Sequence, residues 1–183
     1  MTKLPQIRNI KTIAKSRLFD IEEVELQFSN GNQAVYERLA GSDNGGVLVV
    51  PLVENDMILL IREYSVGFER YEIGFVKGRI ENGESPQSAA AREMREEIGF
   101  GAKQLRLLTS VSLWPNYSPF RTYIFLASKL YESPLNGDEP EELETIAWPV
   151  AKLDSLRTRD DFTDARCLLA TYLVQENISR NDN

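Results

Sequence analysis

The sequence contains no histidine, and this absence restricts the chemistry open to the chain. Without imidazole, neither Ser-His-Asp nor Cys-His catalysis can operate, and no histidine-based metal site can form. The single cysteine, Cys167, cannot form an internal disulfide or a thiolate cage, which is typical of a reducing compartment. Metal ligands must therefore be carboxylates or carbonyls, which favour hard cations such as Mg²⁺ or Mn²⁺. A general base must be Glu, Asp, Lys, Tyr or that cysteine.

Long apolar runs and clustered positive charges are also scarce. The longest apolar run, residues 47–53, is too short to span a bilayer, and no apolar segment follows the basic N-terminal residues as in a secretory signal. Acidic residues outnumber basic ones, 28 to 21, and no Lys/Arg cluster suited to a polyanion is present. We therefore predict a cytoplasmic protein that binds neither membranes nor nucleic acid.

The 183 residues are sufficient for one domain with an ordinary core, preceded by a smaller arm. In the arm, Val24, Leu26 and Phe28 alternate with polar residues, and residues 29–32 are typical of a hairpin turn. Turn-forming residues at 42–46 predict a boundary between an antiparallel β arm, residues 1–44, and a main domain, residues 45–183. Because three strands cannot bury themselves, the arm should pack on the main domain or on another subunit.

The main domain is predicted to be of the α/β class, with a mixed sheet flanked by helices. Helical patterns cover residues 86–98 and about 161–178. The predicted buried face of the last helix consists of Ala165, Leu168, Leu169, Tyr172 and Leu173. The predicted strands cover residues 47–53, 57–62, 105–113, 122–127 and 144–148.

Residues 78–100 are the segment most informative about chemistry. Ser85 is a good helix N-cap, Pro86 suits the first turn, and Gly99 is a good stop signal. One side of this helix is predicted to be apolar, with Ala90, Ala91, Met94 and Ile98. The other side carries Glu93, Glu96 and Glu97. Since like charges at this spacing repel, these glutamates either face water or are neutralised by cations.

The spacing in this segment distinguishes between those alternatives. It is Gly, five residues, Glu, seven residues, and then Arg-Glu-apolar-x-Glu-Glu-x-Gly-apolar. From average composition, such a match has a chance below about 10⁻⁶ in a chain of this length. The pattern is the Nudix box, so the chain resembles the Nudix hydrolases and is expected to have their α/β/α sandwich fold. The fixed positions are filled by Gly78, Glu84, Arg92, Glu93, Met94, Glu96, Glu97, Gly99 and Phe100.

The resemblance implies a site for divalent cations, Mg²⁺ with Mn²⁺ as an alternative. In this family the box glutamates bind the metal. The ligands implied here are Glu93, Glu97, Glu96 and the backbone carbonyl of Lys77. Arg92 and Glu84 would brace the site, Arg92 by pairing with a carboxylate and Glu84 by closing the loop.

Residues before the box resemble the ADP-ribose pyrophosphatase branch of the family. The branch's "RxY…E" run is matched by Arg62, Tyr64 and Glu72, which implies that these residues contact the substrate. An alternative for Arg62 is an ion pair at a strand edge. Residues 72–78 are two residues longer than the usual "ELPAG" approach. The β arm also fits this branch, where two subunits exchange it, so a homodimer is expected.

The general base of this branch is a glutamate on a loop after the box. The matching stretch, residues 136–144, is acidic, and its alternative interpretation is a solvated loop. Glu139 and Glu142 are preferred to Glu141 as the base, and Glu96 is counted with them as a predicted catalytic residue.

The implied activity is Mg²⁺-dependent hydrolysis of the pyrophosphate bond in ADP-linked compounds, with release of AMP. Several segments, including the arm and residues 71–78, resemble a bacterial subgroup that cleaves ADP-ribose, diadenosine triphosphate and NADH. One alternative is a nucleotide-sugar pyrophosphatase of the GDP-mannose type. Another is a non-catalytic nucleotide-binding Nudix module, although such modules usually lose box glutamates and none is lost here.

Overall fold

The computed structural model describes residues 3–40, 44–54, 56–137 and 139–181. Its backbone divides into two compact units, Met1–Gly45 with Ser112–Arg121, and Gly46–Val111 with Thr122–Asn183. The predicted boundary at residues 42–46 includes positions 42 and 43, which lie outside the described residues. The division into domains 1–44 and 45–183 stays a prediction.

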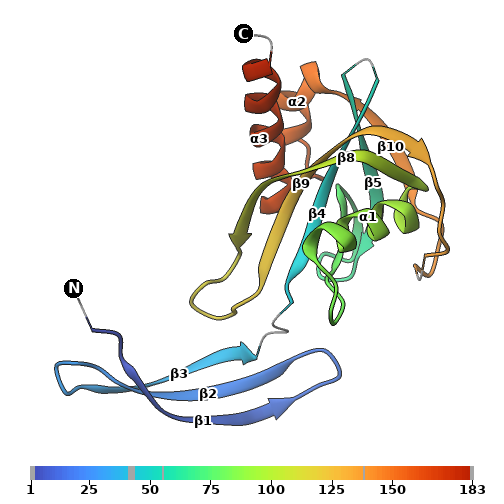
Figure 1. Cartoon of the computed structure of the whole chain (residues 1–183). Helices are drawn as coiled ribbons and strands as arrows, with labels where there is room; N and C mark the ends of the chain where they lie inside the picture. Colours follow the sequence, from blue (N-terminus) through green and yellow to red (C-terminus); the bar gives the residue numbers. More distant parts are fainter. Residues whose placement is uncertain (1–2, 41–43, 55, 138, 182–183) are drawn as a thin grey trace. The chain divides into compact units, whose positions relative to one another are not determined.

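The first unit contains a three-stranded antiparallel sheet, as the arm prediction required (Figure 1). Its strands are β1 (Gln6–Lys15), β2 (Asp20–Gln27) and β3 (Gln33–Ala40), in that spatial order. The predicted hairpin turn joins β2 to β3, with Gly31 at φ +87° and the Phe28 N–H donating to the Asn32 carbonyl at 2.8 Å. The Leu39 N–H donates to the Tyr117 carbonyl at 2.8 Å, which attaches residues 112–121 to this sheet.

The second unit is built on one mixed sheet. Its strands are β4 (Gly46–Val53), β5 (Met57–Ser65), β6 (Arg70–Gly74), β7 (Val76–Arg79), β8 (Phe100–Ser112), β9 (Arg121–Glu132) and β10 (Glu144–Pro149). The main path runs β10-β5-β4-β9-β8, while β6 pairs with β5 and β7 pairs with β4. Because β4 and β9 are parallel whereas β4 and β5 are antiparallel, the mixed sheet predicted from the sequence is confirmed.

Helices cover both faces of this sheet, giving the predicted sandwich (Figure 1). They are α1 (Pro86–Glu97), the 3₁₀ turn η1 (Val150–Lys152), α2 (Leu153–Arg157) and α3 (Ala165–Asn181). One apolar cluster joins α1 to the sheet through Ala90 and Met94, and a second joins α3 through Cys167 and Val174. In the described part of the chain, no helix is both long and apolar enough to span a membrane.

The buried faces of α1 and α3 differ from the predicted ones. Tyr172 is 57% exposed, and its ring lies 3.8 Å from the Arg157 guanidinium carbon. The fully buried residues of α3 are Cys167, Ala170, Thr171 and Val174. In α1, Ala89 is buried and Ala91 is exposed. Small side chains such as alanine and cysteine let each helix approach the sheet closely, which turns the larger apolar side chains toward the edges of the contact.

Candidate active site

α1 carries three glutamates of the box, Glu93, Glu96 and Glu97, near its C-terminal end. The helix begins as predicted, with the Ser85 hydroxyl accepting the Ser88 N–H at 3.1 Å and Pro86 in the first turn. It ends at Glu97, and Gly99 follows at φ +75°, a conformation that glycine adopts without strain.

Arg92 is the centre of an ion-pair network on this helix. Its guanidinium donates to Glu84 at 3.1 and 3.0 Å, to Glu93 at 2.8 Å and to Glu96 at 2.8 Å. It also donates to the Arg79 carbonyl at 2.9 Å. The hydrogen bonds with Glu84 raise the pKa of Arg92 and lower the pKa of Glu84, so both groups stay charged. Arg92 thus links Glu84 to two glutamates of α1, and the bracing role of Arg92 and Glu84 stays a prediction.

Glu93 and Glu97 lie against the main chain of Lys77 and Gly78. A Cβ atom at Gly78 would fall only 1.8 Å from the Glu93 carboxyl carbon, so only glycine leaves room for this carboxylate. The Lys77 N–H faces both Glu97 oxygens at 3.4 Å. The structure therefore brings Glu93 and Glu97 of α1 to the Lys77 main chain of β7, whereas Glu96, the fourth predicted ligand, binds Arg92.

Glu97 is partly buried. Burial raises the pKa of Glu97 to about 9, even though the Lys77 ammonium lowers it. The Lys77 ammonium is 3.0 Å from a carboxylate oxygen of Glu63. A divalent cation would stabilise the ionised form of this partly buried carboxyl group, which lies beside the carboxylate of Glu93.

The donor set fits a hard cation, because every side-chain and main-chain donor is an oxygen. Across residues 3–40, 44–54, 56–137 and 139–181, however, no three acidic side chains are already arranged as a metal cage. Glu93 and Glu96 both bind Arg92 instead. Metal binding would therefore require these carboxylates either to turn from Arg92 toward the ion or to contact Arg92 and the ion at the same time.

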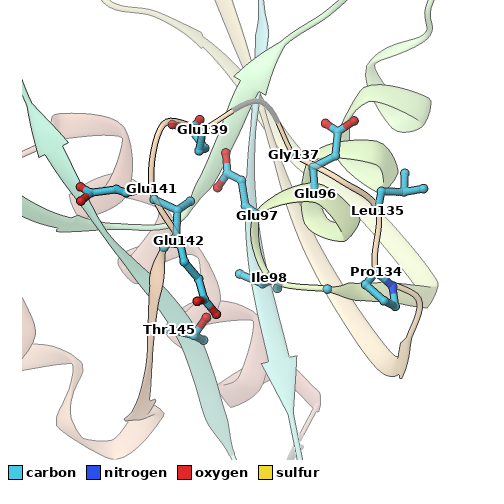
Figure 2. A pocket seen from close by; sticks show the side chains of 12 residues that line it. Glu96, Glu97, Ile98, Pro134, Leu135, Gly137, Glu139, Glu141, Glu142 and Thr145 are labelled. Carbon is cyan, nitrogen blue, oxygen red and sulfur yellow. The ribbon is translucent and has the colours of Figure 1, made fainter.

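A cavity of about 420 Å³ separates the end of α1 from the acidic loop. Figure 2 shows the Glu97 carboxylate pointing toward Glu139, while Glu142 points toward Thr145. Glu141 points away from Glu97 and accepts a hydrogen bond from the Tyr71 hydroxyl at 3.0 Å. Position 138 of the predicted base-bearing stretch lies outside the described residues. All three loop glutamates thus line the cavity, and Glu141 is also bound to Tyr71 of β6.

The three predicted substrate residues lie on β5 and β6, and all have protein partners. Arg62 pairs with Glu144 at 2.8 Å and with Asp161 at 3.6 Å, which is the arrangement expected from the strand-edge alternative. Tyr64 packs edge-on against Tyr71, with ring centroids 5.6 Å apart. Glu72 accepts hydrogen bonds at 2.6 and 2.7 Å, from Arg70 and Thr163. Because Tyr71 also binds the acidic loop, this group adjoins the loop that borders the cavity.

Sequence reasoning missed three contributors to this region: the Lys77 side chain, Glu63 and Asp161. Glu63 lies between Arg62 and Tyr64 of the "RxY…E" run, and this position is a sequence signal for it. Asp161 lies on the loop before α3 and belongs to no motif. Phe75, the residue between β6 and β7, is fully buried and packs edge-on against Phe162, with ring centroids 6.1 Å apart.

Fold, box and arm together define the class of protein. The family described as "NUDIX domain" matches residues 44–170, and the "NudE-type Nudix hydrolase N-terminal domain" matches residues 5–38. The chain belongs to the Nudix family and is a Nudix pyrophosphohydrolase.

Individual relatives are similar over almost the whole chain. "ADP compounds hydrolase NudE" of Escherichia coli (strain K12) is 47% identical, over 94% of this chain and 92% of its own length. "ADP-ribose pyrophosphatase" of Bacillus subtilis (strain 168) is 28% identical, over 90% and 92%. A crystal structure of an ADP compounds hydrolase has a TM-score of 0.94 and 45% identity, covering 99% of this chain and 97% of that one. These matches confirm the resemblance to the ADP-ribose pyrophosphatase branch and to its ADP compounds hydrolase.

Proposed function

We propose that this chain is an Mg²⁺-dependent pyrophosphohydrolase of ADP-linked compounds such as ADP-ribose, diadenosine triphosphate and NADH, and that it releases AMP. The observation that carries the proposal is that Glu96 and Glu97 of the box share one cavity with the glutamates of the acidic loop, while Glu93 binds Arg92 beside them. The 47% identity to a relative named for ADP compounds supports the substrate class.

The proposed metal ligands are Glu93, Glu97, Glu96 and the Lys77 carbonyl, with Mn²⁺ as an alternative ion. A bound divalent cation would neutralise the pyrophosphate charge and lower the pKa of an attacking water. Arg92 keeps Glu93 and Glu96 oriented through hydrogen bonds of 2.8 Å each. Because both carboxylates bind Arg92, a metal ion would compete with that guanidinium for them.

The proposed general base is Glu139 or Glu142, with Glu96 as the third catalytic residue. Glu139, Glu141 and Glu142 all line the cavity beside Glu97, but the Tyr71 hydroxyl already binds Glu141. The base takes a proton from water, the water oxygen bonds to one phosphorus, and the P–O bond of the pyrophosphate bridge breaks. AMP and a phosphorylated remainder leave.

Arg62, Tyr64 and Glu72 are proposed to contact the substrate. A substrate phosphate would compete with Glu144 and Asp161 for the Arg62 guanidinium, which can bind phosphate through two parallel hydrogen bonds. We further propose a cytoplasmic homodimer.

The first experiment measures AMP release from ADP-ribose with Mg²⁺, beside Glu97→Gln and an EDTA control. We expect AMP from the wild type and its loss in both controls. If no AMP forms, the same assay with diadenosine triphosphate, NADH and GDP-mannose decides between the ADP-linked class and the nucleotide-sugar alternative. Failure with all four would favour a non-catalytic module.

A glutamine scan of the loop tests the assignment of the base. We expect Glu139→Gln or Glu142→Gln to lower kcat by at least about tenfold, within the range for loss of a general base. Glu132→Gln, at the exposed end of β9, is the matched control. If none of Glu139, Glu141 and Glu142 changes kcat by that much, the base does not lie on this loop.

A further inference from the structure

The Lys77 side chain is a largely buried charge that the proposed function leaves unused. Lys77 lies on β7 and Glu63 on β5, two strands that are both paired to β4. Their ion pair measures 3.0 Å, and the two side chains are 24% and 42% exposed. The pair therefore ties the strand that enters the box to a neighbouring strand of the sheet.

The surroundings of this ammonium are crowded. A Cβ atom at Gly74 would lie 3.5 Å from both the Lys77 Nζ and the Cys167 Sγ, so Nζ reaches a buried part of the unit. A buried ammonium requires a paired carboxylate, so Glu63 determines where this side chain can rest.

The main chain of Lys77 takes part in the proposed metal site twice. Its carbonyl is a proposed ligand, and its N–H faces both oxygens of Glu97 at 3.4 Å. We propose that the Lys77–Glu63 ion pair is a positioning device, which holds the main chain of residue 77 where its carbonyl and Glu97 can bind the same ion. This inference rests on the proposed function.

A simple electrostatic role makes the opposite prediction for the lysine. A fixed cation beside Glu97 repels a divalent ion, so removing the ammonium alone would tighten metal binding. Removing the Glu63 carboxylate would weaken it, and removing both would leave the net charge and the affinity nearly unchanged. Positioning predicts instead that each change weakens binding, and that the double variant is no weaker than either single variant.

The test is a titration with Mn²⁺ alone, followed by the electron paramagnetic resonance signal of the free ion, on the full chain without substrate. The variants are Lys77→Met, Glu63→Ala and the two combined, with exposed Lys103→Met on β8 as the control for charge. We expect about a tenfold rise in the Mn²⁺ Kd for each single variant and for the double variant, as for other groups that orient metal ligands. Lys103→Met should bind like the wild type, and Lys77→Arg should recover most of the affinity.

Three results would overturn the proposal. Tighter Mn²⁺ binding by Lys77→Met would indicate an electrostatic role for the ammonium, and unchanged binding would indicate no role. A roughly hundredfold loss of Mn²⁺ affinity in the double variant would mean that the two residues act independently. If Lys77→Met does not fold, the Mn²⁺ Kd of the double variant tests the proposal by itself, because that variant buries no unpaired charge. Wild-type affinity in the double variant would contradict positioning. Failure of the proposed function is distinguishable, because wild type and Glu97→Gln would then bind Mn²⁺ equally.

Discussion

Gly78 is the position where a single added methyl group would disturb the site most. We predict that Gly78→Ala lowers Mn²⁺ affinity and kcat by at least about tenfold, because the new Cβ would fall 1.8 Å from the Glu93 carboxyl carbon and displace that proposed ligand. Manganese titration and steady-state AMP release would measure both effects. Gly67→Ala is the matched control, since nothing lies within 4 Å of its added Cβ. Equal behaviour of the two variants would show that the Glu93 carboxylate can move away from residue 78 without loss of metal binding or activity.

Glu97 should make the stability of the metal-free protein depend on pH. Its folded pKa of about 9 lies above the ordinary value of 4.5, so between these values the folded state holds a proton that the unfolded state releases. This contribution to stability is complete below pH 4.5 and is lost as the pH rises through about 9.

In EDTA, the Tm of the wild type relative to Glu97→Gln should therefore fall between about pH 5 and pH 9. Mg²⁺ should raise the wild-type Tm more at the higher pH. At lower pH the ion must displace the proton of Glu97, whereas at higher pH Glu97 is already ionised and the ion neutralises its charge. Differential scanning calorimetry would measure both trends. A Tm difference that is constant over this range would mean that Glu97 ionises normally.

At the scale of elements, the N-cap of α1 should affect stability but not catalysis. Ser85→Ala removes the acceptor of the Ser88 N–H and should lower the free energy of unfolding by about 1 kcal/mol. Urea denaturation would measure the loss, and Ser85→Asp should restore most of it. Since the glutamates of the site lie at the other end of the helix, kcat should stay within about twofold; a larger drop would show that the two ends are coupled.

Elements with strong local signals could be predicted from the sequence. Ser85, Pro86 and Gly99 mark the ends of α1, and the turn at residues 29–32 marks a hairpin. Weaker signals gave errors: β8 starts at Phe100, five residues before the predicted strand, and α2 was not predicted. α3 starts at Ala165, after the predicted 161, because residues 158–164 form a loop whose Phe162 is buried in the core.

The same distinction between local and distant signals applies to the site. The box could be identified because its residues are close in sequence, with spacing imposed by one loop and one helix. The partners of Arg62 could not be identified, since Glu144 faces it only through the register of β5 and β10, and Asp161 reaches it from a separate loop. Such contacts depend on how strands pair across the whole sheet, which no window of neighbouring residues contains.

At the scale of the whole molecule, the arm is expected to determine the oligomeric state. Apolar residues lie exposed along its sheet, among them Ile7, Ile10, Val35 and Tyr36. Exposed apolar surface of this kind is typical of protein interfaces. We predict that the full chain is a homodimer and that a chain lacking residues 1–44 is monomeric. Size-exclusion chromatography with light scattering would measure both masses, and a monomeric full-length protein would refute the exchanged arm.

Cys167 is completely buried between α3 and the sheet, and burial raises the pKa of its thiol to about 12. Thiol reagents attack the thiolate, so they can reach this sulfur only while α3 is detached from the sheet. As the sequence contains no second cysteine, a single reaction amplitude reports on that event. The rate at which Cys167 is labelled in the native protein therefore measures how often α3 separates from the sheet.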